Sequence, residues 1–365
     1  MRRWLQSFAQ ASGLGGRHNS SSSQQRFSLS ARLKLLLLAL VMAGLWYLAG
    51  PSAMSAEEEA LWEKVRAAQS HISQWRQDNG IASAEADDPW QCGLIGVEWS
   101  GITTTLGDPG AKRTACNPAW AIQFGRWYSD LGLEPGDPVA IYSSSSFPGL
   151  LLSALAAAEA MGLEPLMIVS LGASTWGANH MQSPWPVIAT ELRRAGFVRH
   201  RADYYTLGGD AESGLDLAPE AVSLLRAAAD TAGVEMITAA NLQDMIAHKS
   251  GLLERHQARL LVSIGGSHAN LGDDPEVLRM PTGLVLPDEG SSVGNGVIGA
   301  ALRADIPVIH MLNIRSLSGL NGIPYDRQPR RMAPARVSAW WAGIGVLVFF
   351  AVVLRHRRWK LEPEK

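Results

Sequence analysis

Apolar residues gather near both ends of the chain in two stretches that contain no charged residue. The first reads LLLLALVMAGLWYLAGPSAM from Leu35, and the second reads VSAWWAGIGVLVFFAVVL from Val337. At the rise of an α-helix, each stretch is long enough to cross about 30 Å of hydrocarbon. The pattern predicts transmembrane helices over residues 35–54 and 337–354. A cleaved signal peptide is the alternative for the first stretch, but a long segment precedes it and its cleavage signal is poor.

Basic residues on the outer sides of these stretches predict the orientation. Those before the first stretch are Arg2, Arg3, Arg17, Arg26, Arg32 and Lys34, with no acidic residue among them, and those after the second include Arg355, Arg357, Arg358 and Lys360. Because positive residues favour the cytoplasmic side, we expect both termini to lie in the cytoplasm and the protein to lie in the bacterial cytoplasmic membrane. The low-complexity basic tail over residues 1–34 and the basic tail over 355–365 would then contact anionic lipids.

This topology would place the residues between the two stretches outside the cytoplasm, at the bacterial cell surface. ATP and nicotinamide cofactors are not supplied there, and the domain has neither a Walker loop nor a dinucleotide fingerprint, so we expect no cofactor. It also lacks a basic stripe with interleaved aromatic residues, so we expect no nucleic-acid partner. The domain holds 21 of the 32 Lys and Arg residues and 32 of the 34 Asp and Glu residues, which makes it net acidic by about eleven charges.

Residues 55–80 have the pattern of a helix. Glutamates occupy the expected first turn, and Gly80 ends the pattern. The apolar positions recur at the spacing of a coiled-coil seam: Leu61, Val65, Ala68, Ile72 and Trp75. Two heptads are too few to define a coiled coil, so we expect this helix to pack on its own domain, with self-association as the alternative.

Residues 81–336 alternate between short apolar runs and segments of helical periodicity. The alternation is clearest from Asp137 onward, where PVAIYS, PLMIVS, RLLVSIGG and PVIHML are separated by segments such as FPGLLLSALAAAEAMG. Apolar runs without polar alternation are typical of strands that are buried on both faces. The predicted fold class is therefore α/β, with a mostly parallel sheet and helices on both faces.

Serine and glycine are abundant where four of the predicted strands end, in residues 143–146, 170–175, 263–270 and 288–295. Ligands of parallel sheets collect at this edge, and small residues, hydroxyls and helix N-termini suit a carboxylate or another oxyanion. The predicted ligand-binding residues are Ser143, Ser144, Ser145, Ser146, Ser170, Ser174, Thr175, Gly265, Gly266, Ser267 and Asn270. The alternative for the first loop is that one of its serines merely caps the helix that begins near Pro148.

Nucleophilic catalysis is a further possibility at the same loops. The stretch from Gly290 to Gly294 matches the G-x-S-x-G elbow around Ser292, but residues 287–289 separate it from its strand, so a chance match is favoured. Ser267 with His268 is a second possibility, oriented by Asp108, Glu98 or Asp288, and Ser144 is a third. Nothing in the spacing establishes a triad, so whether the protein is an enzyme remains open at this level.

The cysteine and histidine residues give two further expectations. Cys92 and Cys116 are the only cysteines, and in an oxidising compartment they can form a disulfide, with two buried free thiols as the alternative. His180, His268 and His310 are scattered without an H-x-x-x-H or H-E-x-x-H pair, so we expect no metal site and place His310 in a strand interior.

Several stretches together resemble one known family. GLIGVEWSGITTTLGDPGAKRTACNPAWA, VAIYSSSSFPGLLLSALAAAEAMGL, MIVSLGASTWGAN and LLVSIGGSHANLG, between the two apolar stretches, are similar to the bacterial poly-gamma-glutamate system protein. The resemblance covers roughly residues 90–325 and implies a membrane component of capsule or polymer production that accompanies other membrane subunits of the synthase and exporter. A carboxylate polymer would need cationic contacts, for which Lys112, Arg113 and Arg126 are the candidates; ordinary surface solvation is the alternative.

Three functions remain open on these grounds. The first is an accessory, non-catalytic domain that binds poly-γ-glutamate at the serine and glycine loops. The second is a serine amidohydrolase or transferase that cuts γ-glutamyl amide bonds through Ser144, Ser267 or Ser292. The third is a structural scaffold for the other membrane subunits, built on the helix over residues 55–80.

Overall fold

The computed structural model describes residues 36–45, 54–81, 85–290, 294–334 and 339–356. Contacts divide the chain into two units, one made of residues 50–337 and the other of residues 1–49 with 338–365. The basic tail over residues 1–34, nearly all of the tail over 355–365 and Ser292 lie outside the described residues.

The larger unit is built on a seven-stranded sheet with the strand order β6-β5-β3-β2-β7-β9-β8. Every neighbouring pair is parallel except β8 with β9. Its strands are β2 Pro138–Ser144, β3 Glu164–Ser170, β5 Tyr204–Thr206, β6 Glu235–Met236, β7 Leu261–Ile264, β8 Gly283–Val285 and β9 Val308–Met311. A separate parallel pair joins β1 Thr103–Thr105 to β4 Ala173–Ser174. The predicted α/β class and the mostly parallel sheet are confirmed.

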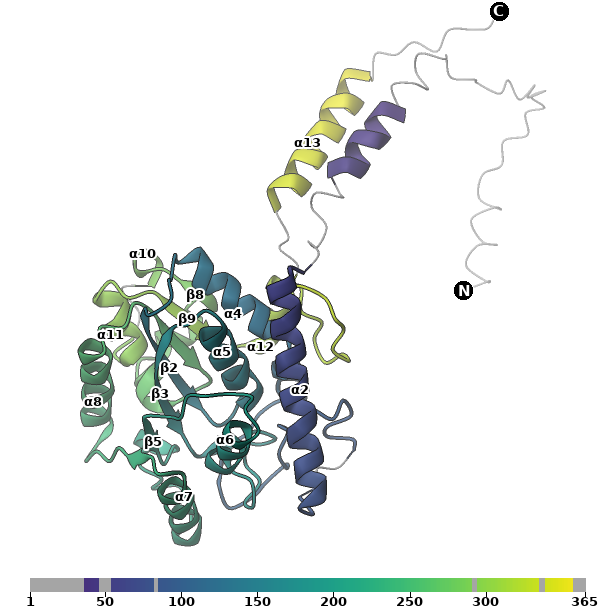
Figure 1. Cartoon of the computed structure of the whole chain (residues 1–365). Coiled ribbons are helices and arrows are strands. Elements are labelled where there is room, and N and C mark those ends of the chain that lie inside the picture. Colours follow the sequence, from purple (N-terminus) through teal and green to yellow (C-terminus); the bar gives the residue numbers. More distant parts are fainter. Residues whose placement is uncertain (1–35, 46–53, 82–84, 291–293, 335–338, 357–365) are drawn as a thin grey trace, which may run out of the picture. The chain divides into compact units, whose positions relative to one another are not determined.

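Helices cover both faces of this sheet. Successive side chains of a strand point to opposite faces, and both sets are apolar here, so each face needs a covering layer. Val139 and Ile141 of β2 pack in one hydrophobic core, and Ala140 and Tyr142 pack in the other. Figure 1 shows α8 and α11 on one side and α2, α5 and α6 on the other. The helices of this unit are α2 Ala56–Asp78, α3 Pro109–Ala115, α4 Ala119–Asp130, α5 Pro148–Ala160, α6 Trp185–Arg194, α7 Pro219–Ala232, α8 Leu242–Arg255, α9 His268–Leu271, α10 Pro287–Gly290, α11 Val297–Arg303 and α12 Ile314–Leu320, with short 3₁₀ turns η1 Asp210–Glu212 and η2 Pro275–Arg279.

Helix α2 packs on its own domain, as the sequence predicted. Ser55 and Glu58 form a capping box at its start, and Gly80 follows its end with a φ of +68°. The apolar positions Leu61, Val65 and Ile72 are buried in the hydrophobic core of the domain. A seam buried in this way is not available for a coiled coil with another subunit.

The predicted transmembrane helices are wrong for the part of the chain that the structure describes. Among those residues, no helix combines the length and the apolar character that crossing a bilayer requires. The helix within the first stretch is described over residues 36–45, which corresponds to about 15 Å of helix. In the second stretch, α13 Ala339–His356 reaches 18 residues only by including Arg355 and His356 at its end.

The predictions that depended on these two helices are therefore not supported either. They are the location in a bacterial membrane, the cytoplasmic termini and the extracytoplasmic position of the α/β domain. The exclusion of nucleotide ligands on grounds of compartment is likewise withdrawn, although the absence of a Walker loop and of a dinucleotide fingerprint is a property of the sequence itself.

Cys92 and Cys116 lie together in the interior as free thiols, not as the predicted disulfide. Their side chains are hydrogen-bonded to each other. Burial raises the pKa of the Cys92 thiol, and the contact with Cys116 raises it further. The Cys92 thiol is therefore held in the protonated form, which is the less reactive one.

The burial of Ile72 gives a test of the role of α2. Ile72→Ala removes a side chain that is 0% exposed, so we expect it to lower the free energy of unfolding by about 2–5 kcal/mol. Ser70→Ala, on the exposed side of the same helix, should change that free energy by no more than about 0.5 kcal/mol. Urea unfolding followed by circular dichroism measures both. Equal stability of the two variants would contradict the packing of α2 on the domain.

Candidate functional site

A cavity of about 550 Å³ lies at the carboxyl ends of the parallel strands. In the sheet, β3 lies on one side of β2 and β7 lies on the other. The chain builds the sheet outward from β2 in one direction first and then returns to β7 to build it in the other, so the strand order reverses between β2 and β7. Such a switch point is where ligands of open parallel sheets bind. Residues that follow β2, β3, β5 and β7 all contribute to the cavity wall.

The serines of the first loop have four different environments. Ser143 and Ser144 belong to β2 itself, paired with Val169 and Ser170 of β3. The Ser143 hydroxyl donates to the carbonyl of Ser144, and the Ser145 hydroxyl donates to the carbonyl of Ser170. The Ser146 hydroxyl accepts from the backbone N–H of Ser174. None of these side chains caps α5, whose N-cap residue forms no side-chain cap.

Ser144 is the serine whose hydroxyl is free. Its Oγ is buried and has no hydrogen-bond partner within the described residues, although the residue lines the cavity. Gly265 makes room for it, because a Cβ at that position would lie 2.3 Å from Ser144 Oγ. Gly265 also has a φ of +80°, which favours glycine. A buried hydroxyl without a partner is costly in the free protein, and a ligand oxygen in the cavity would satisfy it.

Lys112 and Ser174 meet in the wall of the same cavity. Lys112 Nζ donates to the carbonyl of Ser146 over 2.5 Å and lies 2.6 Å from Ser174 Oγ. The ammonium group also lies over the ring of Phe147, 3.8 Å from its centroid. Both residues are buried, and Lys112 is only 2% exposed. Burial lowers the pKa of Lys112 to about 7, although Cys116 and Asp108 act in the opposite direction.

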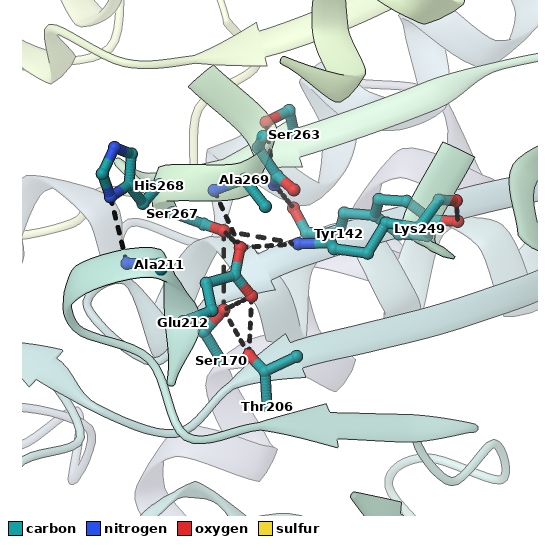
Figure 2. A network of polar contacts seen from close by, with 11 residues as sticks. Tyr142, Ser170, Thr206, Ala211, Glu212, Lys249, Ser263, Ser267, His268 and Ala269 are labelled. Carbon is teal, nitrogen blue, oxygen red and sulfur yellow. Dashed lines mark hydrogen bonds and ion pairs between the residues drawn. The ribbon is translucent and has the colours of Figure 1, made fainter. Parts of the chain in front are cut away.

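A carboxylate at the floor of the cavity organises the neighbouring strand ends. Glu212 accepts hydrogen bonds from five donors, as Figure 2 shows: the hydroxyls of Ser170, Thr206 and Ser267, the ammonium group of Lys249 and the backbone N–H of Ala269. The Glu212–Lys249 ion pair is almost completely buried, with side-chain exposures of 0% and 1%. This network joins β3, β5, α8 and the loop after β7.

The donors around Glu212 determine its protonation. Burial alone would raise the pKa of this carboxyl, but the Lys249 charge and the hydrogen bonds from Ser267 and Thr206 outweigh burial and lower the pKa to about 2. Glu212 is therefore ionised at neutral pH. It holds the hydroxyls of Ser170 and Ser267, which both line the cavity, in fixed positions.

The structure brings some of the predicted ligand-binding residues to the cavity and leaves others outside. Those that line it are Lys112, Ser144, Ser146, Ser170, Ser174, Gly266 and Ser267. Ser143, Ser145, Thr175, Gly265 and Asn270 lie behind its wall; Thr175 bonds Gly107 and Asn270 bonds Tyr142 and Ser263. Arg113 pairs with Asp326, and Arg126 pairs with Glu58 and the carbonyl of Pro334, so these two guanidinium groups already have partners.

The side chains of Ser267 and His268 diverge. Ser267 bonds Glu212, whereas His268 accepts from the backbone N–H of Ala211 and contacts Asp210 and Asp273. Figure 2 shows the imidazole directed away from the serine. The acids proposed for a triad lie elsewhere: Asp108 caps α3, Asp288 lies in α10, and neither Asp288 nor Glu98 lines the cavity. The pair as arranged therefore does not form a nucleophile and base.

The fourth predicted loop does not contribute to the cavity. It follows β8, which runs antiparallel to β9, so the loop begins at the opposite edge of the sheet. None of its described residues lines the cavity, and Ser292 lies outside the described residues. His310 lies in β9 and is fully buried, as expected for a strand interior.

Sequence reasoning missed Glu212, Lys249 and Gly107. Lys249 could have been noticed, because it follows Met245 by four positions on the apolar side of a predicted helix. Glu212 stands in an irregular segment that has no periodicity and therefore gave no signal. Gly107 was part of a quoted stretch, but its place beside Lys112 and Ser174 depends on long-range folding.

The Glu212 network predicts a pH-dependent stability. Because the pKa of Glu212 falls from 4.5 to about 2 on folding, its contribution is present above pH 4.5 and is lost as the pH falls toward about 2. Glu212→Gln leaves Lys249 charged and unpaired, so we expect a loss of about 3–5 kcal/mol at neutral pH. The double variant Glu212→Gln/Lys249→Met should recover part of that loss. Urea unfolding across this pH range measures both effects, and a single variant as stable as the wild type would contradict them.

Comparison with known proteins adds no family assignment. No protein-family model matches the chain, and no curated protein matches it. The resemblance to the poly-gamma-glutamate system protein therefore rests on the quoted stretches of sequence alone. What the cavity does must be inferred from its own geometry.

Proposed function

We propose that the cavity binds a carboxylate ligand, and that this ligand is the end of a poly-γ-glutamate chain. The observation that carries the proposal is the buried, unpartnered hydroxyl of Ser144, a residue that lines the cavity. It lies just before α5, whose N-terminus has no side-chain cap and contributes partial positive charge. A ligand oxygen placed there gains a hydrogen bond and a favourable dipole.

The charges of the cavity favour a chain end over an interior segment. Asp210 and Asp216 line the cavity beside the hydroxyl groups, so the site is not uniformly suited to anions. The amino end of a γ-linked chain carries an ammonium group as well as a carboxylate, and the two aspartates complement the ammonium group. A volume of about 550 Å³ is in the range of small-molecule sites and suits one end of a polymer.

The cavity supports the part of the proposal that the ligand is a carboxylate. The choice of poly-γ-glutamate as that ligand rests on the sequence resemblance. The cationic contacts expected from sequence play a smaller part than anticipated. Arg113 and Arg126 already have partners, and burial lowers the pKa of Lys112 to about 7, which weakens its part as a fixed positive charge. Hydroxyl groups and a helix N-terminus are thus the main recognition elements in this proposal.

Two neighbouring serines provide a matched test. Ser144→Ala removes the free hydroxyl, so we expect binding of a short γ-glutamyl oligomer to weaken about 5- to 10-fold, the equivalent of one hydrogen bond. Thermal stability should not fall and should rise slightly, because the substitution removes a buried hydroxyl that has no partner in the free protein. Isothermal titration calorimetry measures the affinity.

Ser145→Ala is the control. Its hydroxyl donates to the carbonyl of Ser170 and does not line the cavity, so this variant should lose some stability and keep its affinity for the oligomer. The proposal would be contradicted if the wild type bound no γ-glutamyl oligomer, or if Ser144→Ala bound as tightly as the wild type.

A further inference from the structure

Lys112 differs from the other buried lysine of the site in having no counter-ion. Lys249 pairs with Glu212, whereas Lys112 forms no ion pair with a carboxylate within the described residues. Its Nζ is surrounded by the carbonyl of Ser146, the hydroxyl of Ser174 and the ring of Phe147. A lysine in such surroundings loses its proton readily and can act as a base.

The geometry directs that base at one hydroxyl. The carbonyl of Ser146 can only accept, so it takes one N–H of Lys112. When the amine is neutral, its lone pair is then available to the hydroxyl of Ser174, which lies 2.6 Å away. This distance is within the range in which a general base takes a proton.

The backbone on both sides holds the pair in place. Asp108 caps α3, on which Lys112 lies, by accepting from the N–H groups of Gly110 and Ala111. Ser174 lies on β4, which pairs with β1, and its backbone N–H donates to the hydroxyl of Ser146.

Gly107 keeps the approach to the pair open. A Cβ at this position would lie 3.0 Å from Lys112 Cε and 3.1 Å from Ser174 Oγ. Both Gly107 and the pair line the cavity, so a ligand there can reach the hydroxyl.

We infer that Ser174 is a nucleophile activated by Lys112, and that the cavity catalyses acyl transfer from an amide or ester to water. The choice of a γ-glutamyl amide as substrate rests on the proposed function; the assignment of nucleophile and base does not. The reaction class is one in which a serine and a neutral lysine suffice without a histidine.

The steps balance with water as the second reactant. Lys112 takes the proton of Ser174 while Oγ bonds to the carbonyl carbon, and the π electrons move to the carbonyl oxygen. Collapse of this intermediate breaks the C–N bond, and the departing amine takes the proton from Lys112. Water then attacks the ester on Ser174, gives a proton to Lys112, and that proton returns to Oγ as the acid leaves.

Several ionisable groups lie near Lys112 or line the same cavity. Asp108 and Cys116 are the ionisable neighbours that favour its charged form, and Asp210, Asp216, Glu212 and His268 line the same cavity. Burial is the larger effect and lowers the pKa of Lys112 to about 7. We therefore expect reactivity to rise with pH and to level off above about 7.

A fluorophosphonate probe tests the nucleophile without any carboxylate ligand. Incubation of the full-length protein should give a covalent adduct, which peptide mass spectrometry locates at Ser174. Lys112→Met and Lys112→Arg should both slow labelling about 100-fold or more, because neither side chain can accept the proton. Ser145→Ala should be labelled like the wild type, and thermal melting verifies that each variant is folded.

The outcomes separate the two proposals. An adduct at Ser174, lost in Lys112→Arg and rising with pH in the wild type, supports the inference even if γ-glutamyl oligomers do not bind. Absence of any adduct on Ser174 overturns it, whatever calorimetry shows for the carboxylate. Unchanged labelling in a folded Lys112→Arg variant would also overturn it, because an arginine stays protonated at these pH values.

Discussion

The buried Glu212–Lys249 ion pair is the interaction on which the shape of the cavity depends. An isolated charge in the interior is very unfavourable, and a paired one becomes tolerable only when its remaining hydrogen-bonding capacity is filled. Glu212 meets this condition with three hydroxyls and a backbone N–H besides Lys249. Ala211 and Glu212 both have a positive φ, of 49° and 56°. This strained backbone persists because the network around the carboxylate fixes it.

The two buried lysines show how one residue type acquires two behaviours. Burial lowers the pKa of each lysine. Lys249 has Glu212 in direct contact to oppose that effect, whereas the Lys112 ammonium contacts a carbonyl, a hydroxyl and an aromatic ring, and the more distant Cys116 and Asp108 oppose burial less. The first lysine contributes to the architecture of the strand ends. The second has a proton that it can exchange near neutral pH, and this difference comes from the neighbours that the fold supplies.

The sequence predicted the layers of the fold well, because its signals were local. Apolar runs gave the parallel strands, and the glutamates and Gly80 marked the ends of α2. The serine loops after β2, β3 and β7 were placed at one edge by topology alone, and they do line one cavity. The fourth loop was misplaced because β8 runs antiparallel, which no periodicity reveals.

The remaining errors have physical causes of the same kind. Apolar composition predicted transmembrane helices, but within the described residues no helix is both long enough and apolar enough to cross a bilayer. Contacts between segments that are far apart in the sequence also could not be predicted. Lys112 and Ser174 are 62 positions apart, and Glu212 and Lys249 are 37 apart. Spacing along the chain carries no information about such pairs.

The common direction of the parallel strands also gives the domain two unlike rims. Every cavity residue contributed by β2, β3, β5 or β7 comes from the rim where those strands end. The rim where they begin carries exposed turns, such as the one over residues 134–136 that leads into β2. Exposed turns tolerate insertions. A fluorophore or an immobilisation tag attached there would leave the mouth of the cavity open to solution. This rim is therefore the suitable place to label the protein or to attach it to a sensor surface.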